Sequence, residues 1–199
     1  MSRSILSDSR CDEIKKEVLF LYEECEVHTY PIDCFAIAQK LYYVLRPYSS
    51  LDPEHYFEAF RTDPDGFSTV EVNPETGMNQ YVIYYNDTAN FGRMRWTILH
   101  EIGHIYLGHH DNPDDSNYLL EEAEADFFAK YAIANPPLVN ISKCECPNDI
   151  QETFQTSYQA SVFLFDYFQK WLHFGPREYL PFELKIIELF EAADRKSVV

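Results

Sequence analysis

The sequence predicts an α+β fold with a small antiparallel sheet and a helical C-terminal extension. Two segments with alternating apolar residues flank a turn within residues 67–85, which is typical of a β-hairpin. Residues 118–135 are rich in alanine and contain neither glycine nor proline, so they predict a strong helix that the following Pro-Pro pair ends. Helical patterns dominate the remaining C-terminal residues.

Spacing and capping residues predict the other N-terminal helices. Apolar side chains recur at helical spacing over residues 10–25, which indicates a first helix. Pro31 suits a first helical turn and predicts a second helix over residues 31–43. Asp52, followed by a proline, predicts the N-cap of a short helix that ends near residue 60.

The composition changes after Pro137, where a polar loop is expected over residues 138–148. Further helices are predicted over about residues 149–157, 158–173 and 182–194. The middle helix carries too much aromatic surface for a solvated helix, so we expect it to pack on the preceding domain, with a partner chain or a repressor as the alternatives. The prediction is therefore one domain over residues 1–137 and a helical C-terminal extension over residues 138–199 packed on it.

Composition indicates a folded cytoplasmic protein. The 199 residues, 46% of them hydrophobic, can bury a sizeable core. No apolar run approaches the roughly 18 residues that span a membrane, and the polar residues 1–4 are unlike a signal peptide. The five cysteines show no spacing typical of a disulfide framework, so we expect reduced thiols.

The formal net charge of −17 constrains the partners. Such an acidic chain repels phosphate backbones, so direct binding of nucleic acid is disfavoured. The same charge attracts a basic protein, although solubility alone explains the acidity equally well.

Residues 100–104 read His-Glu-Ile-Gly-His and carry the strongest functional signal. On a helix, His100 and His104 lie one turn apart on the same face, so their imidazoles converge on one point. Glu101 points to the side and can reach a water held at that point. This HEXXH helix is the minimal apparatus of a zinc peptidase, with two nitrogen ligands and a carboxylate that accepts a proton.

The surroundings of the two histidines are apolar, which indicates a buried helix. Buried imidazoles without partners cost roughly 1–3 kcal/mol each, and a bound metal removes that cost. The alternative is a core helix with two histidines at an incidental spacing.

The third zinc ligand is expected from the helix over residues 118–135, because a catalytic zinc takes three protein ligands and leaves one position open. Glu122 and Asp126 share a face of this helix. We assign Glu122 as the ligand and Asp126 as the acceptor that orients His100. Glu121 and Glu124 fall on other faces. A solvated acidic face is the alternative for all four carboxylates.

The second strand of the hairpin runs towards the metal helix, and its edge is expected to accept an extended substrate. Within this strand, Tyr81, Tyr84 and Asn86 are the candidate substrate-binding residues, and an ordinary core hairpin is the alternative. Cleavage also needs a proton donor or oxyanion stabiliser, for which four residues are open candidates: Tyr84, Tyr118, His109 and His110. The helix dipole favours capping over ligation for the two histidines of this group.

The residues around these motifs resemble the ImmA/IrrE metallopeptidase family. The resemblance covers roughly residues 30–137 and is specific in residues 93–129, which contain the histidines and the segment Glu-Ala-Glu-Ala-Asp at 122–126. It implies a zincin-like fold of the gluzincin type, in which glutamate is the third ligand. It also implies a regulatory protease that cleaves or otherwise inactivates a helix-turn-helix repressor.

We therefore predict a zinc-dependent endopeptidase with Glu101 as the general base and Zn²⁺ as the cofactor. Its expected partner is a basic DNA-binding repressor. Two alternatives belong to other classes: a binding module that masks a repressor without cleaving it, which would act as an antirepressor, and one half of a toxin-antitoxin pair. The intact Glu101 favours the enzyme, since a pure binder has no need of the base.

Overall fold

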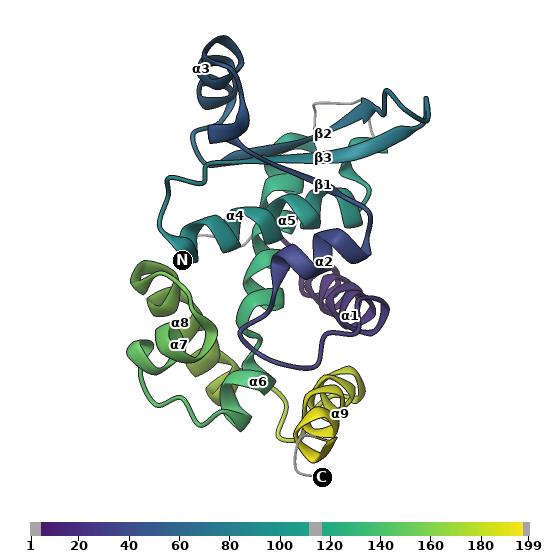
Figure 1. The fold of residues 1–199 in the computed structure, drawn as a ribbon. Helices are drawn as coiled ribbons and strands as arrows, with labels where there is room; N and C mark the ends of the chain where they lie inside the picture. The colour runs from purple at the N-terminus through teal and green to yellow at the C-terminus, as the bar shows by residue number, and fades with distance from the viewer. Residues whose placement is uncertain (1–4, 112–116, 197–199) are drawn as a thin grey trace.

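Helices dominate the chain, which the computed structural model describes over residues 5–111 and 117–196 (Figure 1). The polar residues 1–4 that we compared with a signal peptide lie outside this part. In chain order, the helices are α1 (Asp8–Glu24), α2 (Cys34–Lys40), α3 (Pro53–Thr62), α4 (Phe91–Tyr106), α5 (Tyr118–Ala134), α6 (Pro136–Ile141), α7 (Pro147–Phe154), α8 (Tyr158–Phe174) and α9 (Pro181–Lys196), with 3-10 turns η1 (Tyr48–Ser50) and η2 (His109–Asp111).

The predicted hairpin forms, and a third strand joins it. β2 (Gly66–Val72) pairs antiparallel with β3 (Asn79–Tyr85), and Ser68 lies opposite Ile83. β1 (Val44–Pro47) pairs with the other side of β3 in parallel, so the strand order is β1-β3-β2. The sheet is therefore mixed. The prediction of an antiparallel sheet was wrong because it did not include β1.

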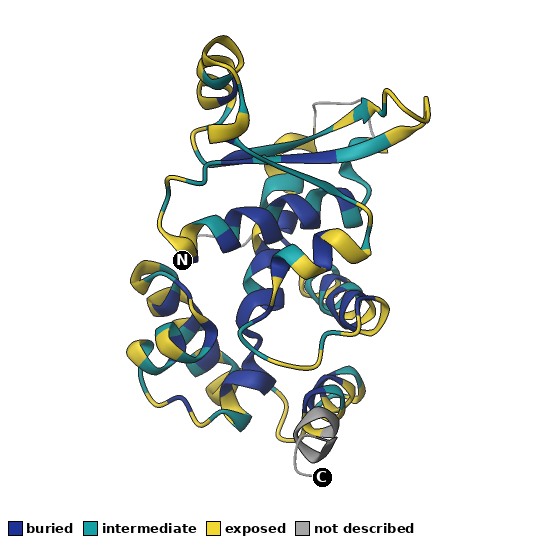
Figure 2. Ribbon diagram, in the orientation of Figure 1, coloured by how far each residue is buried: buried dark blue, intermediate teal, exposed yellow. Residues whose placement is uncertain are grey.

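The sheet covers one side of α4, and α3 lies beyond the sheet on the opposite side (Figure 1). Ile83 and Tyr85 point from β3 into a core that they share with Ile98, Leu99 and Ile102 of α4. The buried residues continue along α5 and α6 and over the inner face of α1 (Figure 2). This packing fixes α4 between the sheet and α5.

Capping residues set several helix ends. Asp52 accepts hydrogen bonds from the first turn of α3, as predicted. α2 is shorter than predicted, because Asp33 rather than Pro31 begins it by accepting from two backbone N–H groups. Asn135 ends α5 and caps the next helix by accepting from Leu138 N. α6 thus occupies part of the expected loop, since proline is favourable in a first helical turn.

The helices after α6 pack back on the rest of the chain. α8 contacts α7 and α6, while α9 contacts α1 and α6. The ring of Phe190 in α9 meets that of Tyr22 in α1 edge-on, at a centroid distance of 5.5 Å. Within the described ranges, no helix combines the length and apolarity that a membrane crossing requires. All five cysteines are free thiols, as expected.

A buried arginine ties α4 to two distant segments. Arg95 is 2% exposed, and its guanidinium donates to the carbonyl oxygens of Phe154 and Gln155 at 2.6 and 2.7 Å. It also donates to the carbonyl of Ile32, before α2. These carbonyls lie at the end of α7 and in the segment before α2, so one side chain satisfies backbone groups from two distant parts of the chain.

We expect Arg95→Met to lower the free energy of unfolding by about 3 kcal/mol or more, because a buried carbonyl without a donor costs about 1–3 kcal/mol. Arg93→Met is the matched control. Arg93 lies two residues earlier, is 56% exposed and pairs with Asp65 at the surface. Its loss should cost no more than about 1 kcal/mol. Chemical denaturation measures both, and equal losses would contradict the role given to Arg95.

Candidate metal centre

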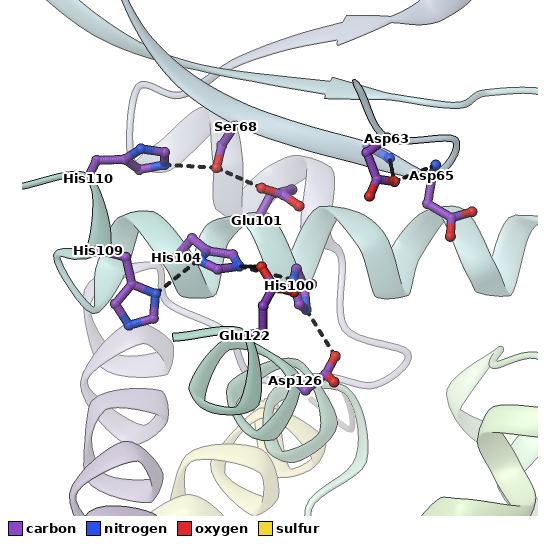
Figure 3. A network of polar contacts seen from close by, with 11 residues as sticks. Asp63, Asp65, Ser68, His100, Glu101, His104, His109, His110, Glu122 and Asp126 are labelled. Carbon is purple, nitrogen blue, oxygen red and sulfur yellow. Dashed lines mark hydrogen bonds and ion pairs between the residues drawn. The ribbon is translucent and has the colours of Figure 1, made fainter. Parts of the chain in front are cut away.

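Two histidines of α4 and one glutamate of α5 converge, as the sequence predicted. Nε2 of His100 lies 3.5 Å from one carboxylate oxygen of Glu122, and Nε2 of His104 lies 3.4 Å from the other. The two Nε2 atoms are 3.1 Å apart. Figure 3 shows the three side chains pointing toward one another between the helices. These three residues can hold a metal ion.

The local sequence explains this convergence. Asn90, ten residues before the first histidine, caps α4 by accepting from Arg93 N. The four-residue spacing then places both imidazoles on the side of α4 that faces α5. The hydrogen bonds of His100 and His104 lower the pKa of Glu122, so this carboxylate is ionised at neutral pH.

Asp126 lies one turn after Glu122 and contacts the far side of the first histidine. Its Oδ1 is 3.1 Å from Nδ1 of His100. Burial of His100 favours the neutral imidazole, but the hydrogen bonds with Asp126 and Glu122 outweigh it and raise the pKa of His100 to about 10. Asp126 thus contacts Nδ1 of His100, while Nε2 of the same ring faces Glu122.

Glu101 is buried on the side of α4 that faces the sheet. Ser68 of β2 donates a hydrogen bond to its Oε2 at 2.7 Å, and Nε2 of His110 lies 2.9 Å from the same hydroxyl oxygen. Burial raises the pKa of Glu101, while His100 and the Ser68 hydrogen bond act in the opposite direction. The row His110–Ser68–Glu101 is visible above α4 in Figure 3. Ser68 has no motif around it, and sequence reasoning missed it.

The second histidine also has a partner on its far side. Nδ1 of His109 lies 2.9 Å from Nδ1 of His104, and Nε2 of His109 lies 3.1 Å from Oε2 of Glu124. Arg10 of α1 pairs with both oxygens of Glu124. Sequence reasoning gave His109 a capping role and left Glu124 on another face of α5. That face is buried, and it contacts α1 and η2.

The prediction that β3 offers a free edge to the substrate was wrong, because β3 is the central strand. Tyr81 lies on the same face as Ile83, toward α4, and its ring is 5.9 Å from that of His110. Tyr84 points to the opposite face, where its hydroxyl bonds with Arg46 and Glu71. Its proposed contact with substrate at the metal site was therefore wrong.

Asn86 follows β3 and holds the adjacent loop. Its side-chain amide donates to the carbonyl of Pro64 and its amide oxygen accepts from Thr88 N. The structure brings Tyr81 to the site and gives Asn86 contacts elsewhere. Its role in substrate binding stays a prediction.

The four candidate proton donors lie in different surroundings. Tyr84 is on the far face of the sheet, and His109 is engaged by His104 and Glu124. His110 stands next to Glu101 through Ser68, and burial lowers its pKa. Tyr118 is exposed at the start of α5, where the charge of Glu122 raises its pKa. His110 and Tyr118 are therefore the two candidates that stay open: His110 lies near Glu101, and Tyr118 lies near Glu122.

A family comparison matches this same part of the chain. The family model described as Peptidase U49 matches residues 32–138, more than half of the sequence. The chain belongs to the Peptidase U49 family. The match runs from just before α2 into α6 and includes the sheet, Glu101 and the three converging residues. A peptidase was predicted from the motif, and the family confirms it. No curated protein matches the chain.

We expect His100 to stay protonated at pH 8 in the metal-free protein, because its pKa is raised from 6.5 to about 10. A raised histidine pKa means that the cation persists through neutral pH. Ring signals followed by NMR across pH 5–11 measure this titration. Asp126→Asn should lower the pKa of His100, since the hydrogen bond to a carboxylate is lost. A His100 titration near 6.5 in the wild type would refute this.

Proposed function

We propose that the chain is a zinc-dependent endopeptidase in which His100, His104 and Glu122 hold the metal. The observation that carries this proposal is the spacing of the three donors. In a tetrahedral zinc site with bonds of about 2.0–2.1 Å, neighbouring ligand atoms lie about 3.3–3.4 Å apart. The three separations here are 3.1, 3.4 and 3.5 Å. The donor set of two imidazoles and a carboxylate is one that catalytic zinc uses.

The surrounding residues support the assignment of roles. When bound, zinc lowers the pKa of its water to about 7 and polarises the scissile carbonyl. Glu101 accepts a proton from the attacking water at a carboxylate oxygen and donates it to the leaving amine nitrogen. Burial makes Glu101 a stronger base, and Ser68 holds its carboxylate in place. Asp126 accepts the Nδ1 proton of His100 and thereby leaves Nε2 free for the metal.

We propose β2 as the strand that receives the substrate. In the described part of the chain, β2 is an edge strand, and its Ser68 contacts Glu101 directly. An extended peptide that pairs with this edge would run alongside α4. His110 lies beside the same serine and is the favoured group to stabilise the oxyanion, with Tyr118 as the second choice.

The substrate class is proposed from charge and from resemblance. A net charge of −17 attracts basic segments, and DNA-binding repressors carry them. The resemblance to ImmA/IrrE peptidases implies a helix-turn-helix repressor, cut in the cytoplasm at an exposed segment. Masking of the repressor without cleavage is the competing function that the second experiment below separates from proteolysis. A toxin-antitoxin pairing is the other alternative.

The first expected outcome is about one zinc per chain in the purified protein, because three ligands and one open position complete the site. His104→Ala and Glu122→Ala should lose the metal during dialysis against a weak chelator. Glu121→Ala, which removes the neighbouring carboxylate of α5, should keep it. Elemental analysis measures all four proteins. Equal zinc in wild type and His104→Ala would exclude this site.

The second concerns catalysis. Glu101→Gln should retain zinc and abolish cleavage, because the amide keeps the shape of the side chain but cannot accept the proton. The protein is incubated with the repressor encoded nearest to its gene, and intact masses are measured. One zinc-dependent cut that Glu101→Gln cannot make supports the peptidase. Loss of DNA binding with the repressor uncut would favour masking instead.

A further inference from the structure

His109 lies directly behind His104. After α4 ends, Gly108 takes a φ of 77°, in the left-handed region that glycine enters without steric cost. This turn leads into η2 and brings the two rings to a centroid distance of 5.0 Å, at an angle of 76°. The Nδ1 atoms then meet at 2.9 Å. One of them must donate and the other accept, so each ring restricts the tautomer of the other.

Glu124 defines the far end of this contact. Its side chain is 8% exposed, and its Oε2 is 3.1 Å from Nε2 of His109. Arg10, 114 residues away in the sequence, donates from Nε and Nη2 to its two oxygens at 2.8 and 2.7 Å. A two-point contact of this kind fixes the plane of the carboxylate. The buried charge is neutralised by Arg10, so Glu124 remains an acceptor for His109.

The proton positions follow from this fixed end. Ionised Glu124 can only accept, so Nε2 of His109 carries a proton and donates it. If Nε2 of His104 binds the metal, the proton of that neutral imidazole is on Nδ1, which would donate to Nδ1 of His109 at 2.9 Å. Nε2 of His104 would then carry no proton and would face the metal beside Glu122.

We propose that Arg10, Glu124 and His109 form a positioning chain that holds His104 in the tautomer and orientation required of a metal ligand. This inference rests on the proposed zinc site. It gives the two histidine ligands different supports. His100 is oriented by Asp126, a carboxylate that is 65% exposed, whereas His104 is oriented through a second imidazole by a buried carboxylate. The positioning chain also makes α1, which lies outside the family match, part of the site.

The expected effect is a loss of zinc affinity. His109→Phe, Glu124→Gln and Arg10→Gln should each weaken zinc binding by about 10–100-fold, as expected when the partner of a metal-binding histidine is removed. Two matched controls are Glu121→Gln on α5 and Glu13→Gln, which removes the other carboxylate that contacts Arg10. Both should change affinity less than about threefold. Competition with a chromophoric chelator gives the dissociation constants, and circular dichroism verifies the fold.

A spectroscopic measurement separates positioning from mere structural support. Ring ¹⁵N shifts of the zinc-loaded protein should show the proton of His104 on Nδ1 and that of His109 on Nε2. In Glu124→Gln, the preference of His109 for Nε2 should weaken while the fold is retained. The double variant Arg10→Gln/His109→Phe should lose no more affinity than the worse single variant, because both act through one chain.

The possible results separate a failure of the positioning chain from a failure of the proposed zinc site. If all three variants bind zinc as tightly as the wild type does, the positioning chain is wrong and the zinc site is unaffected. The opposite tautomers in the wild type would also overturn it. Wild-type protein that binds no zinc would overturn the zinc site itself and the inference with it.

Discussion

The close approach of α4 and α5 at Gly103 is the constraint on which the site depends. A Cβ atom at this position would lie 3.0 Å from Cδ1 and 3.2 Å from Cβ of Phe128. That is tighter than side chains normally pack, so any larger residue would require the Phe128 side chain to shift. His100 and His104 lie on either side of this contact on α4. Their separation from Glu122 is set by it, because interiors packed to this density do not deform freely.

Sequence reasoning succeeded where the information is local. Helix geometry fixes the relation of His100 to His104, and of Glu122 to Asp126, within one turn. The N-cap at Asp52 and the hairpin around residues 73–77 also depend only on neighbouring residues. Convergence of the two helices needed one further assumption, namely that a catalytic metal takes a third ligand.

The failures involve contacts between segments distant in the sequence. β1 has four half-buried residues and becomes a strand only because β3, 38 positions later, pairs with it. That pairing made β3 central and removed the edge that we had assigned to substrate. Ser68 is 33 residues from Glu101 in the sequence, and Arg10 is 114 residues from Glu124. The residues next to Ser68 and Arg10 in the sequence form no motif that predicts these contacts. From the sequence alone, the face of α5 that carries Glu124 is expected to be solvated, because its contact with Arg10 of α1 cannot be predicted locally.

The three hydrogen bonds of Arg95 bear on how the protein is made. A ribosome that has released the chain as far as Asn135 has already supplied all three converging donors. The carbonyls of Phe154 and Gln155 come later, and until they arrive the guanidinium of Arg95 is short of two of its acceptors. The contacts that Arg95 gives to the helix with both histidines are therefore complete only after α7 has been synthesised.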